Sequence, residues 1–314
     1  MKSMDMKRRT MVLASKLYYK DNLTQQQIAQ QLNVSRMKVS RLLQQAKEEG
    51  IVRITIDYSG TYPGMEKELQ DKYRLKDAVV IDTSVGVPAK EQVASAAAFY
   101  LENYTKKRST IAVGWGTTMK LVPDYIHQME AYDLTFCPII GGQGQRELDM
   151  HATTIASNFA KKTGGRALSL IAPALVENGE EKQILMRNDL IRRVVETTAN
   201  AEYAVFSLGN PLVINSSISK SGYFIDEDLA QLEREGAVCD LVSTVFLNKE
   251  SGECCKSITD RCIGITGQQL KRIPNKICVV ESEEKKESVK AALNGGYIDI
   301  LIVDQVIAEY LIKQ

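Results

Sequence analysis

Apolar positions at helical spacing mark three short segments near the N-terminus. The first segment, residues 7–19, carries one apolar face made of Met11, Ala14, Leu17 and Tyr18. A second helix is predicted to begin after Thr24, because Gln27 stands three residues later and completes a capping-box pattern. Its apolar side chains also recur at helical spacing, so both segments are predicted to bury one face.

The second and third segments are spaced as a helix-turn-helix. The third helix is predicted to run from its N-cap Ser35 to about Glu49, with Gly50 ending it. Asn33 tolerates the left-handed backbone that a tight turn between the two helices requires. Two short helices joined in this way form a unit that reads the DNA major groove, although an unrelated helical hairpin would share the pattern.

The outward face predicted for the third helix is cationic and hydrogen-bonding. Arg36 and Lys38 suit guanine edges or phosphates, and neighbouring hydroxyl groups suit phosphates. The residues that we predict to contact double-stranded operator DNA are Thr24, Gln25, Ser35, Arg36, Met37, Lys38, Ser40 and Arg41. Residues 51–58 alternate apolar and polar side chains, which predicts a short strand after this helix.

Farther along the chain, apolar runs alternate with amphipathic segments. The predicted strands are 78–81, 110–113, 134–140, 167–171, 203–208, 241–246, 276–280 and 298–303. The predicted helices are 65–73, 88–104, 117–128, 150–161, 190–198, 227–235, 283–293 and 305–312. Alternation of this kind predicts an α/β fold with a doubly wound, mostly parallel sheet.

The chain is predicted to divide at a run of turn-forming residues, Tyr58-Ser-Gly-Thr-Tyr-Pro-Gly64. We expect a helix-turn-helix domain at 1–57, a linker at 58–64 and a larger domain at 65–314. Residues 1–53 hold eleven Lys or Arg and four acidic residues, so this part carries +7 and the remainder −6. A small basic N-terminal domain (the head) joined to a larger acidic domain (the body) is typical of a protein whose head binds nucleic acid.

Composition narrows the class of protein. Of the 314 residues, 44% are hydrophobic and 25% charged, which indicates a globular chain of about two domains. No apolar run approaches a membrane span, and no signal peptide follows the basic N-terminus, so we expect a cytoplasmic protein. The six cysteines form no CxxC pair and have no His at zinc spacing, so we expect reduced thiols and no metal.

Glycine-rich loops follow three of the predicted strands. They are Gly114-Trp-Gly-Thr-Thr118, Gly141-Gly-Gln-Gly144 and Gly209-Asn-Pro211. Open α/β sheets bind ligands at the carboxyl ends of their strands, where glycine lets the backbone approach a ligand and helix N-termini attract anions. The loops therefore predict a small polar ligand, although glycine in such turns also serves backbone geometry alone.

Signatures of catalysis or nucleotide binding do not occur in the sequence. It contains no G-x-G-x-x-G, P-loop or G-x-S-x-G motif. The only histidines, His127 and His151, are more typical of structural or surface positions than of general bases, and the scattered carboxylates form no assignable acid–base pair. The sequence favours binding over turnover.

Several short segments together carry a resemblance to one known family. They are Leu17-Tyr-Tyr19, Thr24-Gln-Gln-Gln-Ile-Ala29, Val39-Ser-Arg-Leu-Leu43, Gly114-Trp-Gly-Thr-Thr118, Cys137-Pro-Ile-Ile-Gly-Gly142, Gly222-Tyr-Phe224, Gly236-Ala-Val238 and Ala291-Ala-Leu-Asn-Gly-Gly296. In these segments the chain resembles the SorC/DeoR-type sugar-binding transcription regulators of bacteria, most of all the sorbitol and sorbose operon regulators. The resemblance covers nearly the whole chain.

This resemblance implies a body folded like glucosamine-6-phosphate deaminase and ribose-5-phosphate isomerase, but without catalysis or a cofactor. It implies a sugar or sugar-phosphate effector, palindromic operators and a homotetramer built as a dimer of dimers. The effector-binding residues that it implies are Gly114, Gly116, Thr117, Thr118, Gly141, Gly142, Gln143, Gly144, Lys220, Asp240 and Lys285. Lys220 and Lys285 would pair with a phosphate and Asp240 would accept sugar hydroxyls, although solvated surface lysines would show the same pattern.

Three positions depart from the family pattern. Ile140 stands where some members carry a lysine that forms a Schiff base with an aldehyde sugar phosphate, which excludes an imine at this site. Cys239 replaces a glycine before Asp240. Glu281-Ser282 replaces the usual Gly-Gly after the penultimate strand, which places an acid where relatives expose bare amides and favours a less charged ligand.

Three functions follow as hypotheses. The first is a transcription regulator of a carbohydrate-utilisation operon, either activator or repressor, whose DNA binding responds to a sugar or sugar phosphate. The second is a sugar-phosphate isomerase or deaminase with a DNA-binding head. The third is a body that only oligomerises and binds no metabolite.

Overall fold

The protein is described by a computed structural model. It covers residues 2–52, 61–84, 86–127, 129, 132–142, 144, 148–213, 216, 218 and 224–314, with the backbone alone for 2–5. Two compact units result, Met1–Ser59 and Gly60–Gln314. The predicted strand at 51–58 and the first part of the predicted linker lie mostly outside the described residues. Within these ranges no helix combines the length and apolarity that a membrane span requires.

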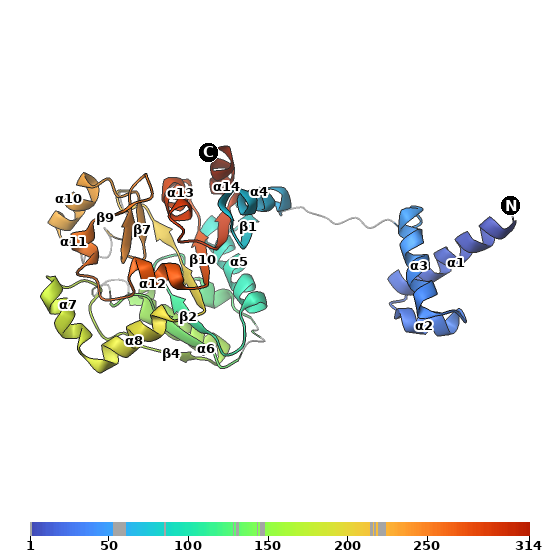
Figure 1. Ribbon diagram of the computed structural model, residues 1–314, viewed down its shortest axis with the longest axis horizontal. Coiled ribbons are helices and arrows are strands. Elements are labelled where there is room, and N and C mark those ends of the chain that lie inside the picture. The colour runs from blue at the N-terminus through green and yellow to red at the C-terminus, as the bar shows by residue number, and fades with distance from the viewer. Residues whose placement is uncertain are drawn as a thin grey trace. The chain divides into compact units, whose positions relative to one another are not determined.

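The N-terminal unit contains three helices packed around one small core (Figure 1). The helices are α1 (Lys2–Tyr19), α2 (Gln25–Gln31) and α3 (Arg36–Glu48). Their buried side chains include Met11, Ile28, Val39 and Leu42, so the apolar faces predicted from the sequence meet in this core. The helix-turn-helix is thereby confirmed, and α1 begins earlier than the predicted residue 7.

Local capping fixes the ends of these helices. The Thr24 hydroxyl accepts from the Gln27 backbone N–H at 3.3 Å, and the Gln27 side chain accepts from the Thr24 N–H at 2.9 Å. The Ser35 hydroxyl accepts from the Lys38 N–H at 3.2 Å at the start of α3. Asn33 adopts the left-handed conformation expected for the turn, with φ of 52°. The capping predictions are confirmed.

The larger unit is built on a seven-stranded parallel sheet in the order β1-β11-β10-β5-β2-β3-β4. The strands are β1 (Asp77–Ile81), β2 (Thr110–Val113), β3 (Thr135–Pro138), β4 (Arg166–Ala167), β5 (Tyr203–Phe206), β10 (Asn275–Val280) and β11 (Ile300–Asp304). In β11, Ile300 and Ile302 enter one core while Leu301 and Val303 enter the other. Apolar side chains therefore cover both faces of the sheet, as parallel strands require.

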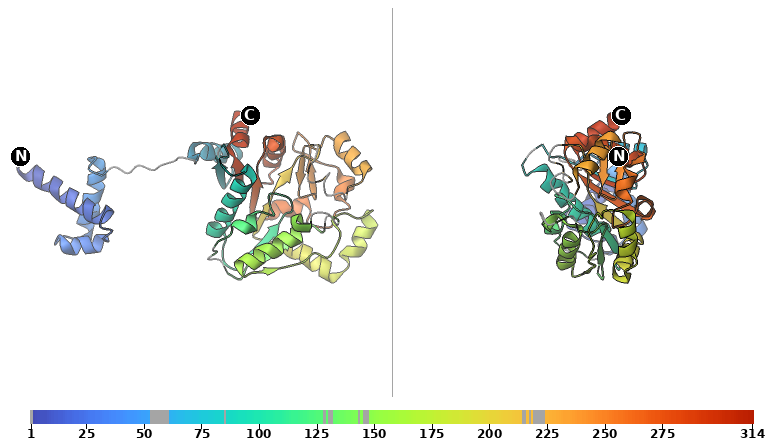
Figure 2. Two further views of the ribbon diagram at one scale, coloured as in Figure 1. Left: turned by 180° about the vertical axis from the view of Figure 1, so that it is seen from behind. Right: turned by 90° about the vertical axis from the view of Figure 1, so that its left-hand side faces the viewer.

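Helices cover both faces of this sheet. On one face lie α5 (Ala89–Tyr104) and α6 (Ala152–Thr163), which Figure 2 shows in teal and green in the view from behind. The opposite face is covered by α4 (Pro63–Tyr73), α8 (Asp189–Ala199), α13 (Lys286–Asn294) and α14 (Gln305–Lys313). The predicted doubly wound, mostly parallel α/β fold is confirmed.

A second, antiparallel sheet was not expected from the sequence. Its strands, in the order β6-β7-β8-β9, are β6 (Leu208–Gly209), β7 (Cys239–Leu241), β8 (Val245–Leu247) and β9 (Glu253–Cys254). The prediction of one strand at 241–246 is wrong, because the chain reverses at Val242 and Ser243, with φ of 50° and 60°. The prediction of one strand at 203–208 is also wrong, since it joins β5 of the first sheet to β6 of the second.

The remaining elements are short. A helix predicted at 117–128 is replaced by turns and the 3₁₀ helix η1 (Val122–Tyr125), because Pro123 has no N–H for an α-helical hydrogen bond. The helix predicted at 227–235 is α10 (Asp226–Arg234). The helix predicted at 283–293 begins as the 3₁₀ helix η3 (Glu283–Lys285) and continues as α13. Elements that the sequence did not predict are α7 (Gly179–Met186), α11 (Lys256–Thr259), α12 (Gly267–Arg272) and η2 (Leu148–Met150).

The glycine loop after β3 ties the parallel sheet to two other segments. The Gly141 N–H donates to the Ile263 carbonyl at 2.9 Å, and the Gly142 N–H donates to the Ala172 carbonyl at 2.8 Å. A Cβ atom on Gly141 would lie 2.5 Å from the Ala172 oxygen and 2.6 Å from the Pro173 oxygen. Gly141 is therefore required for close approach of two backbones.

The neighbouring Gly142 provides a matched comparison for this steric argument. A Cβ on Gly142 would approach its nearest neighbour only to 3.8 Å. Gly141→Ala should lower the free energy of unfolding by about 1–3 kcal/mol, as overpacking does, whereas Gly142→Ala should change it by about 0.5 kcal/mol or less. Urea denaturation followed by circular dichroism measures both, and equal stability of the two variants would contradict the packing role of Gly141.

Candidate functional site

A cavity of about 230 Å³ opens at the carboxyl ends of three neighbouring strands, β10, β5 and β2. After β2 the chain builds the sheet in one direction, through β3 and β4, and then returns to place β5 on the other side of β2. Ligands of open α/β sheets bind where the strand order reverses in this way. The cavity is therefore the candidate ligand pocket.

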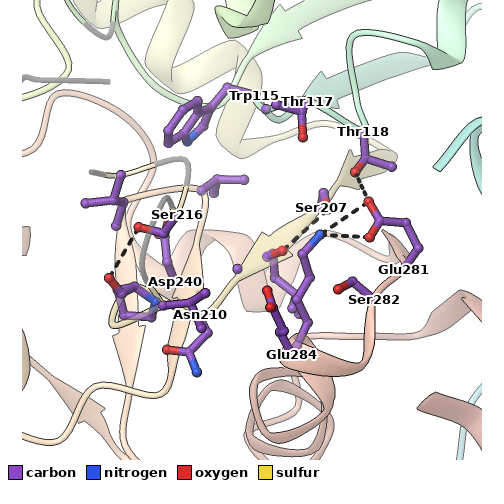
Figure 3. Close-up of a pocket in the computed structure, with 18 of the residues that line it drawn as sticks. Trp115, Thr117, Thr118, Ser207, Asn210, Ser216, Asp240, Glu281, Ser282 and Glu284 are labelled. Carbon is purple, nitrogen blue, oxygen red and sulfur yellow. Dashed lines mark hydrogen bonds and ion pairs between the residues drawn. The ribbon is translucent and has the colours of Figure 1, made fainter. Parts of the chain in front are cut away.

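Polar groups from separate elements face this pocket (Figure 3). Thr117 and Thr118 come from the loop after β2, and Ser207 follows β5 directly. Figure 3 shows Glu281 beside Thr118 on one side and Asp240, from β7 of the second sheet, on the other. The pocket thus joins the ends of the parallel strands to the antiparallel sheet.

Glu281 is a buried charged group on the side of the pocket formed by Thr118. Its side chain is 6% exposed, and its Oε1 atom accepts from the Thr118 hydroxyl at 2.9 Å. The Lys285 ammonium lies 3.5 Å from both carboxylate oxygens, and the Lys90 ammonium lies 3.9 Å from Oε1. Lys90 also donates to the Thr117 hydroxyl at 3.0 Å. Cations and a hydroxyl group thus compensate the buried carboxylate, which otherwise would be costly.

Ser282 places the backbone after β10 in a strained conformation. Its φ of 88° lies in the left-handed region that favours glycine. Its N–H donates to Asp304 Oδ2 at 2.7 Å, and the other oxygen of Asp304 accepts from the Ile307 N–H at 2.8 Å as the N-cap of α14. One buried carboxylate therefore holds both the pocket edge and the start of a helix.

Asp240 is a second buried carboxyl group at the pocket. It is 6% exposed and accepts from the Ser243 N–H at 2.6 Å. Burial raises the pKa of Asp240 from 3.8 to about 7, and the hydrogen bonds from the Ser243 backbone and hydroxyl offset only part of this effect. Near neutral pH this group can accept hydrogen bonds as a carboxylate or donate one as an acid.

The pocket brings together about half of the residues that the resemblance implied for the effector. They are Gly116, Thr117, Thr118, Asp240 and Lys285. Gln143 and Lys220 lie outside the described residues. These assignments as ligand contacts stay predictions.

The other predicted glycines lie elsewhere among the described residues. Gly114 packs against β5, because a Cβ there would lie 2.7 Å from Phe206 Cβ. Gly141 and Gly142 form the backbone ties to the segments described above, and Gly144 has a positive φ of 83°. Of the described residues that line the pocket, none is one of these four. For Gly114 and Gly141 the structure shows a packing role.

Sequence analysis missed several polar residues of the pocket. Lys90, Ser207 and Glu284 line it and lie outside the three glycine-rich loops. Asn210 also lines it and lies within the Gly209-Asn-Pro211 loop, but it was not among the predicted contacts. Ser207 lies near the end of the strand predicted at 203–208 and Asn210 lies two residues after it, so polarity at strand ends would have been a better signal than glycine alone. The described part of the chain contains no group of three or more His, Cys, Asp or Glu arranged for a metal ion.

The candidate DNA-reading surface lies on α3 and the start of α2. The α3 side chains predicted to contact DNA, Arg36, Met37, Lys38, Ser40 and Arg41, are exposed together with the N-cap Ser35. Thr24 is exposed and Gln25 is half-buried. Val39 and Leu42 are buried on the opposite side of α3, so the polar residues share one outward face.

Comparison with known proteins extends these observations to the whole chain. A family model described as "Putative sugar-binding domain" matches residues 63–313, and one described as "Sigma-70, region 4" matches residues 12–48. The deoxyribonucleoside regulator of Bacillus subtilis (strain 168) is 30% identical over 310 residues, which are 98% of this chain and 98% of that protein. The sorbitol operon regulator of Klebsiella pneumoniae is 26% identical over 311 residues, covering 97% and 98%.

A solved structure shows the same fold. The full-length sorbitol operon regulator SorC from Klebsiella pneumoniae superposes with a TM-score of 0.75 at 24% identity. The match covers 97% of this chain and 98% of that one.

The raised pKa of Asp240 predicts a pH-dependent stability. Between pH 4 and 7 the unfolded chain ionises Asp240 while the folded chain keeps it protonated, so its contribution to stability is full below pH 4 and is lost as pH rises through about 7. The pKa difference corresponds to at most about 4 kcal/mol. Relative to wild type, Asp240→Asn should therefore gain stability as pH increases over this range.

Urea denaturation of both proteins from pH 4 to pH 8 measures this difference. Asp226→Asn, the same substitution at an exposed position in the first turn of α10, controls for the loss of one carboxyl group. If the free energies of unfolding of wild type and Asp240→Asn differ by the same amount at every pH in this range, the folded protein does not hold Asp240 protonated.

Proposed function

This chain belongs to the sugar-binding domain family of bacterial transcription regulators, and from that premise we propose that it regulates transcription of a carbohydrate-utilisation operon under control of a carbohydrate effector. Its relatives are transcription regulators, which favours this function over the isomerase or deaminase hypothesis. The observation that carries the proposal is the presence, in one chain, of an exposed cationic helix-turn-helix and a separate pocket at the strand ends.

The helix-turn-helix supplies operator binding. Arg36 and Lys38 project from the first turn of α3, the part of a recognition helix that enters the major groove. The net charge of +7 on residues 1–53 supports attraction to phosphates. Binding to duplex DNA should therefore weaken as salt concentration rises.

The pocket supplies effector binding. Gly116, Thr117, Thr118, Asp240 and Lys285 line a cavity whose size suits a monosaccharide. Carboxyl, hydroxyl and ammonium groups together match the donors and acceptors of sugar hydroxyls. The effector changes transcription because it binds the DNA-competent and DNA-incompetent states of the protein with unequal affinity.

The functional assembly is a homotetramer built as a dimer of dimers. Exposed apolar side chains on the body support self-association: Phe99 is 64% exposed, Ile171 84% and Leu190 75%. A paired arrangement of helix-turn-helix heads matches a palindromic operator, because each head reads one half-site.

Because the helix-turn-helix is proposed to bind DNA and the pocket to bind the effector, Arg36→Ala should affect DNA binding alone. Loss of this exposed cation should cost about 1–3 kcal/mol of affinity for DNA from upstream of its own gene, since one base or phosphate contact is removed. Effector-induced thermal stabilisation should not change. Electrophoretic mobility shift and thermal-shift measurements on the same preparation test both expectations.

Arg234→Ala is the matched control, since it removes the same charge from an exposed position in the last turn of α10. It should leave DNA affinity within about 0.5 kcal/mol of wild type. Equal loss of DNA affinity in the two variants would mean that α3 does not read the operator.

A further inference from the structure

Both lysines that line the described part of the pocket pair with one buried carboxylate. Lys285 and Lys90 lie 3.5 Å and 3.9 Å from Glu281, whose side chain is 6% exposed. The three residues come from the end of β10, the helix η3 and the start of α5. The pocket thus contains an internal counter-ion for its lysines.

The described lining residues together carry no excess positive charge. Glu281 offsets one of the two positive charges of Lys90 and Lys285, Glu284 offsets the other, and Asp240 is a further acidic group. A phosphate monoester carries about −1.5 to −2 charges at neutral pH. To pair with these lysines it would have to lie against the Glu281 carboxylate, and like charges disfavour each other's ionised form at such a distance.

The backbone at the end of β10 is also occupied. The Ser282 N–H, which follows the strand, donates to Asp304 at 2.7 Å. Asp304 is 3% exposed and caps α14, so its carboxylate is fixed in place by a second hydrogen bond. A buried carboxylate thus holds the first amide after Glu281 and repels an anion from this edge of the pocket.

The same groups are well suited to neutral hydroxyls. A carboxylate offers about four lone-pair sites, and Glu281 receives one hydroxyl donor, from Thr118, at 2.9 Å. Asp240 lies across the pocket, with the Ser207 hydroxyl between them (Figure 3). Acceptors on two walls and hydroxyl groups between them match a ligand with several O–H groups.

We propose that the pocket selects an uncharged polyhydroxyl carbohydrate over its phosphate ester, and that Glu281 is the residue that determines this selectivity. The proposal rests on the proposed function of the pocket as the effector site. Glu281 excludes phosphate by holding Lys90 and Lys285, and it accepts from ligand hydroxyls with its remaining lone pairs.

Titration calorimetry on the full chain tests this selectivity. The probes are inorganic phosphate and a panel of polyols and ketoses, each paired with its own monophosphate. In wild type, each ester should bind roughly tenfold or more weakly than its parent compound. Glu281→Gln keeps the side-chain shape but removes the negative charge that faces both lysines, so it should bind inorganic phosphate roughly tenfold or more tightly than wild type.

Glu283→Gln is the matched control. Glu283 is exposed, lies two positions away and pairs with Lys286 at 2.8 Å, so its substitution changes the net charge equally outside the pocket. Phosphate affinity of this variant should stay within about twofold of wild type. An equal gain in both variants would show that net charge, and not Glu281, controls phosphate binding, and would overturn the proposal.

Failure of the proposal is distinguishable from failure of the proposed function. If wild type binds a monophosphate as tightly as or more tightly than its parent, the selectivity is wrong while the effector site stands. If no polyol, ketose or ester binds wild type, and phosphate binds neither wild type nor Glu281→Gln, the pocket is not an effector site and both fall. The wild-type comparison is decisive even if Glu281→Gln does not fold.

Discussion

Burial of the parallel sheet on both faces is the constraint on which the rest of the molecule depends. Alternate residues of β11 enter different cores, and the backbone groups of the central strands are used in the sheet ladder. Polar side chains can therefore meet only where strands end. Glu281 follows β10 and Ser207 follows β5 for this reason, so the position of the pocket is set by the sheet and its chemistry by the residues just after it.

The buried acids of the pocket are stabilised in two different ways. Glu281 has cations on two other elements, which compensate its charge directly. Asp240 accepts hydrogen bonds from the backbone N–H and the hydroxyl of Ser243, both neutral groups, and burial raises the pKa of Asp240 towards neutrality. One acid is therefore a fixed acceptor and the other can change its protonation, so hydroxyl groups of a ligand meet different partners on the two walls.

The sequence predicted those features whose causes are local. The capping box at Thr24, the turn at Asn33 and the apolar runs of the central strands act over a few residues, and each appears in the structure. The β7–β8 hairpin was missed because Val242 adopts a positive φ, which β-branched residues rarely do. Glu281 and Lys285 were singled out from the sequence, but the pairing of Glu281 with Lys90 was missed, because Lys90 on α5 stands far away in sequence and only the folded sheet brings it near. Gly141 looked like a ligand contact because glycine is needed wherever the backbone approaches another group closely, whether that group is a ligand or a second backbone segment. At Gly141 the group is backbone.

Strained backbone conformations occur at the pocket. Val242 and Ser282 line it with φ of 50° and 88°, and Ser243, with φ of 60°, positions the carboxyl group of Asp240. Such conformations persist only where surrounding contacts over-determine them, and here Val242 and Ser243 are almost fully buried while Asp304 holds the Ser282 amide. The walls are thus held in shape by the fold before a ligand arrives. A small carbohydrate makes few contacts, so a pocket that needs little ordering on binding is the arrangement that gives it useful affinity.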